Sequence, residues 1–137
     1  MRIASTGLNA ERTRIDTIAE NIANARTTRT EEGGPYRRKV VIFEPLLMNA
    51  VDAHGRKREE VGGVIAARVV PDPTAKPQYI REPGHPDADE NGMVAYPSVN
   101  TVLEMSDLIT AMRAYEANLK AQESFMRMAE RALRILN

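Results

Sequence analysis

Glycine and proline are confined to the middle of this 137-residue chain, and this distribution constrains its fold more than any other feature. All eight prolines and seven of the eight glycines lie between Gly33 and Pro97, and the one exception is Gly7. Because these residues interrupt regular helices, the two ends of the chain are free to form long helices and the middle is not. We expect a chain of this kind to bring its terminal helices together in space.

The C-terminal segment carries the strongest helical pattern. Its apolar residues recur at alternating spacings of three and four, which predicts an amphipathic helix with a packing seam. Thr101 and Glu104 form a capping-box pattern, so the helix is expected to begin there and to run for roughly 35 residues. Gln122 is the polar position on a seam that otherwise contains Met105, Leu108, Met112, Tyr115, Leu119, Met126, Ala129, Leu133 and Leu136.

The N-terminal segment repeats this pattern more weakly. Leu8, Ile15 and Ile22 recur every seven residues, and Ile18 fills the alternate position of the seam. Asn24 is expected to end the helix, because asparagine tolerates the left-handed backbone conformation that follows many helices. The predicted helix covers roughly 20 residues and is therefore about 20 Å shorter than its partner. Part of the longer seam should stay uncovered within one chain, so we expect other subunits to complete its burial.

The middle of the chain is expected to form loops and short strands. Residues 36–43 and 61–70 are rich in β-branched side chains and are strand candidates, whereas the polar residues 50–60 are expected to form a mobile connection. The predicted fold is mainly α: long N- and C-terminal helices packed as an antiparallel coiled coil, with a small β-rich insert between them. The corresponding domains are a terminal coiled-coil domain (1–30 and 98–137) and the insert (31–97).

Composition argues against several classes of function. The 19 basic and 19 acidic residues balance, so the charge favours neither nucleic acid nor an anionic membrane as a partner. Without cysteine, the chain has no disulfide framework and no thiolate metal site. No apolar run approaches the ~20 residues of a membrane-spanning helix. The first residues turn charged too early for a signal peptide, so export would need a route without a cleaved signal.

One polar pattern suggests an alternative function. Asp87, Asp89 and Asn91 occupy positions 1, 3 and 5 of a calcium-binding loop, but position 12, where the loop needs a bidentate glutamate, is Ser98. A tight turn is the simpler interpretation. A small calcium-responsive adaptor that uses this loop is the alternative hypothesis.

The remaining polar residues favour no catalytic site. His54 and His85 lack metal-ligand spacing, and no P-loop, nucleophile elbow or dinucleotide-binding motif appears. The basic cluster of residues 26–39 contains Tyr36 as its one aromatic residue and is interrupted by the glutamates at positions 31–32, which favours salt bridges within an assembly over nucleic-acid binding. We therefore predict no catalytic, cofactor-binding or metal-binding residues. An enzyme whose site forms only between subunits stays open as a further alternative.

Four stretches of the chain together resemble the FlgC family of flagellar basal-body rod proteins. Residues 20–25 (ENIANA) are similar to a box shared by flagellar rod and hook proteins. Residues 27–39 (TTRTEEGGPYRRK) resemble a sequence particular to FlgC subunits of the proximal rod. The stretch 83–100 and the helical stretch 104–118 follow in the same order. Their order makes the resemblance specific, and it spans nearly the whole chain.

The resemblance implies a non-enzymatic structural subunit of the flagellar rod, without cofactors, that assembles by helix packing. It implies a periplasmic location after export through the flagellar type III apparatus without a cleaved signal. The implied partners are copies of the chain itself, other rod proteins, the membrane-ring junction at the rod base and, in transit, the export apparatus. Nucleic-acid binding and membrane insertion are not expected. The expected assembly interface comprises Leu8, Ile15, Ile18, Ile22, Asn21, Asn24, Met105, Leu108, Met112, Tyr115, Leu119, Met126, Leu133 and Leu136.

Overall fold

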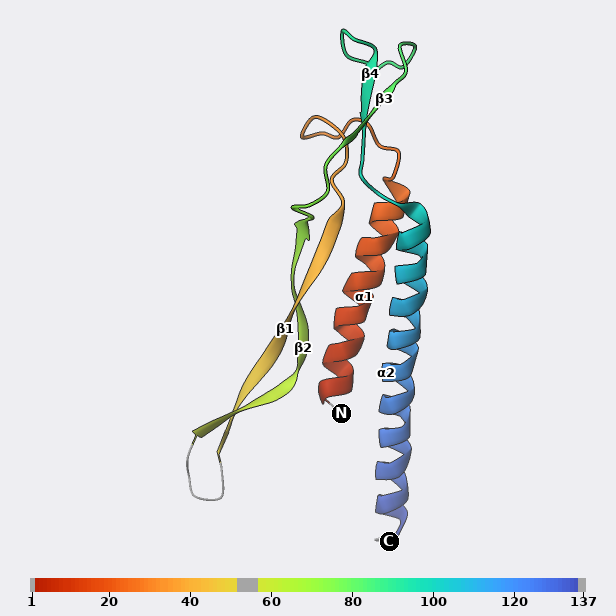
Figure 1. Ribbon diagram of the computed structural model, residues 1–137. Coiled ribbons are helices and arrows are strands. Elements are labelled where there is room, and N and C mark those ends of the chain that lie inside the picture. Colours follow the sequence, from red (N-terminus) through yellow and green to blue (C-terminus); the bar gives the residue numbers. More distant parts are fainter. Residues whose placement is uncertain (1, 52–56, 136–137) are drawn as a thin grey trace.

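Two helices frame the chain in the computed structural model, which describes residues 2–51 and 57–135 (Figure 1). Helix α1 (Arg2–Ala23) comes first and helix α2 (Thr101–Ile135) comes last. Four strands lie between them: β1 (Lys39–Val51), β2 (Lys57–Pro71), β3 (Gln78–Arg81) and β4 (Met93–Tyr96). The prediction of two terminal helices around a β-rich insert is confirmed.

The two helices lie side by side and run in opposite directions (Figure 1). Asn21, near the end of α1, bonds to Glu104 in the first turn of α2, and Gly7 lies against Asn118 further along. A Cβ atom at Gly7 would sit 3.1 Å from the Asn118 Nδ2 atom, so this glycine lets the helices approach closely. Since α1 has 22 residues and α2 has 35, α2 extends about 20 Å beyond its partner.

Asn24 follows the last residue of α1, but it does not end the helix in the predicted way. In residues 2–51 and 57–135, no residue other than glycine has a positive φ. Instead, Asn24 Nδ2 donates to the Glu20 carbonyl at 3.0 Å, and Asn24 Oδ1 accepts a hydrogen bond from Thr27 Oγ1 at 3.1 Å. The Glu20 carbonyl also accepts the Asn24 backbone N–H at 3.0 Å, so the asparagine side chain adds a second hydrogen bond at the helix end and joins it to Thr27.

The cap of helix α2 differs from the capping-box prediction, which is wrong by one residue. Asn100 Oδ1 accepts hydrogen bonds from the backbone N–H groups of Val102 (3.1 Å) and Leu103 (3.2 Å). Asn100 is therefore the N-cap, a position in which asparagine is as effective as serine or threonine. The Glu104 side chain does not accept a hydrogen bond from the backbone at the start of the helix, as a capping box requires, but from Asn21 and Arg38.

The insert consists of two separate antiparallel sheets of two strands each. Strands β1 and β2 form a long hairpin whose pairs run from Lys39↔Pro71 to Val51↔Lys57, with two register shifts. The shorter pair joins β3 to β4. The hairpin strands are longer than predicted, because cross-strand pairing continues through residues 44–51 of β1 and through the charged residues 57–60 of β2. Residues 52–56 of the predicted connection lie outside the described part of the chain.

The hairpin packs on α1 and not on α2. Thr6 Oγ1 on α1 accepts a hydrogen bond from the backbone N–H of Val64 at 3.3 Å, and the Thr6 side chain occupies the space that a Cβ atom at Gly63 would need. Gly63 has a φ of 150°, which favours glycine at this contact. Among the described elements, α2 contacts α1 and neither strand of the hairpin. Helix α1 therefore lies between the hairpin and α2 (Figure 1).

The chain buries little apolar surface. Within the described residues, its buried apolar side chains are those of Ala10, Ile18, Tyr36, Val94, Pro97 and Ala111. A compact monomer of 15.2 kDa exposes about 7,100 Å². This elongated chain exposes 10392 Å², an excess of about 3,300 Å². Neither described helix is long and apolar enough to cross a membrane.

The cap assignment predicts that Asn100→Ala destabilises the chain by about 1 kcal/mol, because two N–H groups of the first helical turn lose their acceptor. Thr101→Ala is the matched control and should change the free energy of unfolding by less than about 0.5 kcal/mol. Urea denaturation followed by circular dichroism measures both. A larger loss for Thr101→Ala would show that the capping box holds in solution.

Candidate assembly interface

A buried asparagine joins the end of α1 to the start of the hairpin. Asn21 is 1% exposed, and all of its hydrogen-bonding capacity is used. Its Nδ2 atom donates to the Lys39 carbonyl (2.9 Å) and to Glu104 Oε2 (3.1 Å). Its Oδ1 atom accepts from Tyr36 Oη (2.9 Å) and from the Lys39 N–H (2.8 Å). Asn21 thus holds three segments that are distant in sequence.

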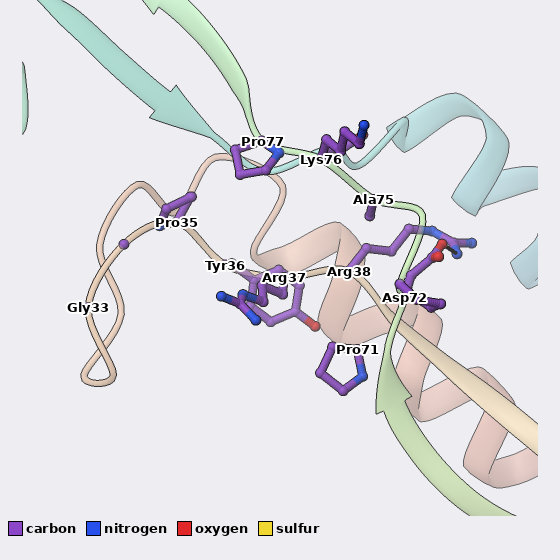
Figure 2. Close-up of a pocket in the computed structure, with 13 residues that line it drawn as sticks. Gly33, Pro35, Tyr36, Arg37, Arg38, Pro71, Asp72, Ala75, Lys76 and Pro77 are labelled. Carbon is purple, nitrogen blue, oxygen red and sulfur yellow. Dashed lines mark hydrogen bonds and ion pairs between the residues drawn. The ribbon is translucent and has the colours of Figure 1, made fainter.

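An arginine extends this network to the end of β2. Arg38 Nε donates to Glu104 Oε1 at 2.7 Å, and Arg38 Nη1 donates to Asp72 Oδ2 at 2.9 Å. Figure 2 shows Arg38 and Asp72 directed toward each other in a cleft that Pro71 and Pro77 also line. Glu104 is only 2% exposed, yet both of its oxygens are hydrogen-bonded. We call Asn21, Tyr36, Arg38, Asp72 and Glu104 the polar lock.

The electrostatics of the polar lock favour its paired state. Burial raises the pKa of Tyr36 to about 12, and the negative charges of Glu20 and Glu104 act in the same direction. Burial disfavours the charged form of Arg38, but the hydrogen bonds and charges of Glu104 and Asp72 outweigh it and raise the pKa of Arg38. Hydrogen bonds from Thr74, and then from Arg38, lower the pKa of Asp72. The tyrosine therefore stays neutral while the arginine and the aspartate stay charged.

Sequence reasoning missed most of the polar lock. It included Asn21 through the box of residues 20–25, but it gave Glu104 a capping role and placed Arg38 in a basic cluster. The partners of Glu104 are 83 and 66 residues away, and local patterns do not encode such separations. The one sequence feature that could have indicated the polar lock was the basic cluster. Two of its residues form close ion pairs within the chain, Arg38 with Glu104 and Asp72, and Lys39 with Glu20.

Helix α1 covers only part of the predicted seam of α2. The side chains of α2 that are buried or half-buried include Leu108 and Tyr115 from the predicted seam, and also Glu104, Ala111, Asn118 and Gln122. On α1, Ile18 and Asn21 are buried, and Leu8, Ile15 and Ile22 are half-buried, as is Asn24 directly after the helix. Direct contacts between the two helices join Asn21 to Glu104 and Gly7 to Asn118.

The rest of the predicted seam is exposed. Met105 is 56% exposed, Met112 48%, Leu119 40%, Met126 47% and Leu133 65%. Leu136 lies outside the described residues. Further large apolar side chains on α2 are exposed as well: Val102, Leu103, Ile109, Phe125, Met128 and Ile135. An apolar surface of this extent is typical of a protein–protein interface.

The stretch considered as a calcium loop forms a turn. Asp89 Oδ1 accepts the backbone N–H groups of Asn91 and Met93, both at 2.8 Å. Asp87 Oδ2 instead accepts a hydrogen bond from Thr28 Oγ1 at 2.8 Å. Within the described residues, no group of three or more acidic, histidine or cysteine side chains could hold a metal ion. No observation favours the calcium-responsive adaptor.

Comparison with known proteins defines the class. Residues 1–29 match the family model described as flagella basal body rod protein. Residues 90–135 match the model for the C-terminal region of flagellar basal body rod FlgEFG proteins. The two matched segments contain both helices, and the chain is thus similar to flagellar rod proteins at both ends.

Whole-chain relatives are more specific. The chain is 43% identical to the flagellar basal-body rod protein FlgC of Borreliella burgdorferi, over 99% of this chain and 95% of that protein. It is 36% identical to FlgC of Salmonella typhimurium, over 96% of this chain and 91% of that protein. For FlgC of Aquifex aeolicus the identity is 40%, over 87% and 81%. The chain belongs to the FlgC family of flagellar basal-body rod proteins. It is a structural component of the flagellar basal body and not an enzyme.

The polar lock predicts a large loss of stability for Glu104→Ala. The substitution leaves Arg38 and the Asn21 amide without a buried acceptor, and breaking a buried ion pair in this way costs about 3 kcal/mol. Glu116→Ala removes an exposed carboxylate from the same helix and should cost less than about 0.5 kcal/mol. Chemical denaturation compares the two. Equal losses would mean that the lock contributes nothing specific to stability.

The raised pKa of Tyr36 predicts a loss of stability at alkaline pH. The unfolded chain releases the tyrosine proton near pH 10, whereas the folded chain keeps it up to a pKa of about 12. This contribution is therefore fully present below pH 10 and disappears as the pH rises toward 12. The free energy of unfolding should fall more steeply over this range in the wild type than in Tyr36→Phe. Tyr79→Phe, at an exposed position, should retain the wild-type slope.

Proposed function

We propose that this chain is a building block of the periplasmic driveshaft of the flagellum and that it transmits motor torque through helix packing. The observation that supports this most directly is the apolar surface of α2. Eleven of its large apolar side chains are exposed, and only Glu104 and Ala111 are buried in that helix. A helix with this pattern gains most of its burial from neighbouring molecules.

The exposed area supports obligate assembly. Obligate interfaces bury about 2,000–5,000 Å² in total, or about 1,000–2,500 Å² on each partner. The excess exposure of about 3,300 Å² is larger than one such contact needs on one partner. It supports contacts on more than one face of the chain, as a subunit inside a rod wall requires.

The proposed mechanical role follows from the arrangement of the elements. Helices α1 and α2 would pack as an antiparallel coiled coil, extended by helices of neighbouring subunits, and would form the domain of residues 1–30 and 98–137. The insert of residues 31–97 would be carried on this domain by the polar lock. Because hydrogen bonds between buried groups fix direction as well as distance, a load on the helices would reach the insert without a change in its orientation.

The proposed partners are copies of this chain and other rod proteins, with the membrane-ring junction at the base of the rod. The proposed route is export through the flagellar type III apparatus without a cleaved signal. We propose that the residues of the predicted assembly interface, given above from Leu8 to Leu136, either contact these partners or join the two helices of one chain. The exposed members, above all Met105, Met112, Leu119 and Met126, are the ones available to other subunits.

The test places a charge on this exposed surface. Leu119→Asp should leave the isolated chain folded, because Leu119 is 40% exposed, but should abolish rod assembly and motility. Swimming in soft agar and electron microscopy of basal bodies provide the measurements. Lys120→Asp, at the neighbouring exposed position, is the matched control, and His85→Ala, in the insert, should be mild. Full motility of Leu119→Asp would overturn the proposed interface.

A further inference from the structure

We propose that the methionine stripe of α2, defined here as Met105, Met112 and Met126, is an oxidation site that controls the assembly of this chain. A peroxide would convert the three thioethers to methionine sulfoxides before the chain assembles, and the oxidised chain would not pack into a rod. Subunits that are already packed would be protected. This inference rests on the proposed assembly function and names a chemical modification that acts on its interface.

The composition of the chain directs oxidation to its methionines. The chain contains seven methionines and has neither cysteine nor tryptophan. A reactive thiolate, where a protein has one, is the sulfur that peroxide attacks first. Because no thiol competes here, the thioether sulfurs are the main targets of a peroxide. Four of these sulfurs lie on α2, in Met105, Met112, Met126 and Met128.

All four methionines of α2 are accessible in the isolated chain. Met105 is 56% exposed, Met112 48%, Met126 47% and Met128 59%. Met93 in β4, by contrast, is half-buried. Susceptibility to oxidation follows exposure, so the methionines of α2 are expected to react before Met93.

Helical spacing places the methionine stripe on one side of α2. Its members are 7 and 14 residues apart, and each interval of seven drifts by only about 20° around an α-helix. From Met105 to Met126 the stripe is about 32 Å long. It also passes Leu119, which the proposed function assigns to neighbouring subunits. Met128 lies about 200° around the helix from Met126 and therefore stands off the stripe.

The reaction needs only a peroxide as oxidant. A lone pair of the methionine sulfur attacks one oxygen of hydrogen peroxide, so that an S–O bond forms and the O–O bond breaks. The other oxygen leaves with both protons as water. The sulfur is oxidised by two electrons and the peroxide is reduced. Methionine sulfoxide reductases reverse the change at the expense of a thiol, so the modification does not destroy the subunit.

Sulfoxides on the stripe would disfavour association. Oxidation replaces a flexible apolar side chain with a polar, chiral one, which disrupts methionine-rich interfaces. A polar oxygen that is buried without a hydrogen-bond donor weakens association by about tenfold or more at each site. Three such sites along one side of α2 would therefore prevent packing. In an assembled subunit the same burial would keep peroxide away from the sulfurs.

Mass spectrometry tests where and when oxidation occurs. The purified full chain and purified basal bodies are treated with hydrogen peroxide, and the sulfoxide at each methionine is quantified after digestion. We expect the methionine stripe to oxidise faster than Met93 in the free chain and to stay reduced in basal bodies. Oxidation of Met93 as fast as the stripe would overturn the proposed selectivity. Equal oxidation of the stripe in both samples would overturn its protection by assembly.

Glutamine substitutions test the effect on assembly, because glutamine resembles methionine sulfoxide in length and in its uncharged polar end. Cells that carry Met105→Gln, Met112→Gln and Met126→Gln together should lose basal bodies and motility. The triple leucine variant keeps apolar side chains of similar volume and should swim. Full motility of the triple glutamine variant would overturn the proposal. An equal loss in the triple leucine variant would do so too, because the defect would not then come from polarity.

Two further variants locate the effect and separate it from the proposed function. Met128→Gln makes the same change off the stripe and should leave the cells motile, whereas a loss equal to that of the triple glutamine variant would show that the stripe is not the site. If Leu119→Asp abolishes assembly while the triple glutamine variant swims normally, the assembly function stands and the oxidation site is wrong. If Leu119→Asp also swims normally, the proposed interface itself is wrong.

Discussion

The buried carboxylate of Glu104 is the interaction on which the arrangement of this chain depends. It lies in α2 and accepts hydrogen bonds from Asn21 in α1 and from Arg38 at the start of the hairpin. One anion therefore joins three elements, and few apolar side chains are buried in the part of the chain that the structure describes. A carboxylate is tolerated in a buried position only when it is fully paired, so its burial requires all three elements to be in place. The polar lock thus determines how the insert is oriented on the helices.

The apolar residues contribute mainly to association with other subunits, whereas the polar lock fixes the arrangement within one chain. In most small domains apolar residues fill the interior, but here the large apolar side chains of α2 are mainly exposed. The contacts between the helices instead use small or polar residues such as Gly7, Ala111 and Asn118. The arrangement of the elements in the isolated chain is therefore fixed by polar contacts, and much of its apolar surface stays exposed. Because association adds that burial, the stability of the subunit depends on its neighbours.

The helices and the insert could be predicted because periodicity and helix-breaking residues are local properties of a sequence. The location of the box at the end of α1 was also predictable, although the way Asn24 ends the helix was not. The face of α2 that meets α1 was not predictable in detail, because Leu108 and Tyr115 are covered while Met112 and Leu119 are exposed. The length of β2 was underestimated because paired strands tolerate charged residues, such as those at 57–60, that suggest a loop. Glu104 was assigned to a capping box because that local pattern was plausible, and its actual partners are distant in the sequence.

The polar lock also connects the two segments that match the rod-family models to the segment between them. Asn21 and Glu104 lie in the terminal segments that match the general rod families, whereas Tyr36, Arg38 and Asp72 lie between those segments. The matched segments of this chain thus provide a buried amide and a buried carboxylate, and the insert provides most of their hydrogen-bond partners. An insert lacking an arginine at this position would leave the carboxylate unpaired, and a helix lacking the carboxylate would leave the arginine unpaired. The two parts are therefore constrained together, although they lie far apart in the sequence.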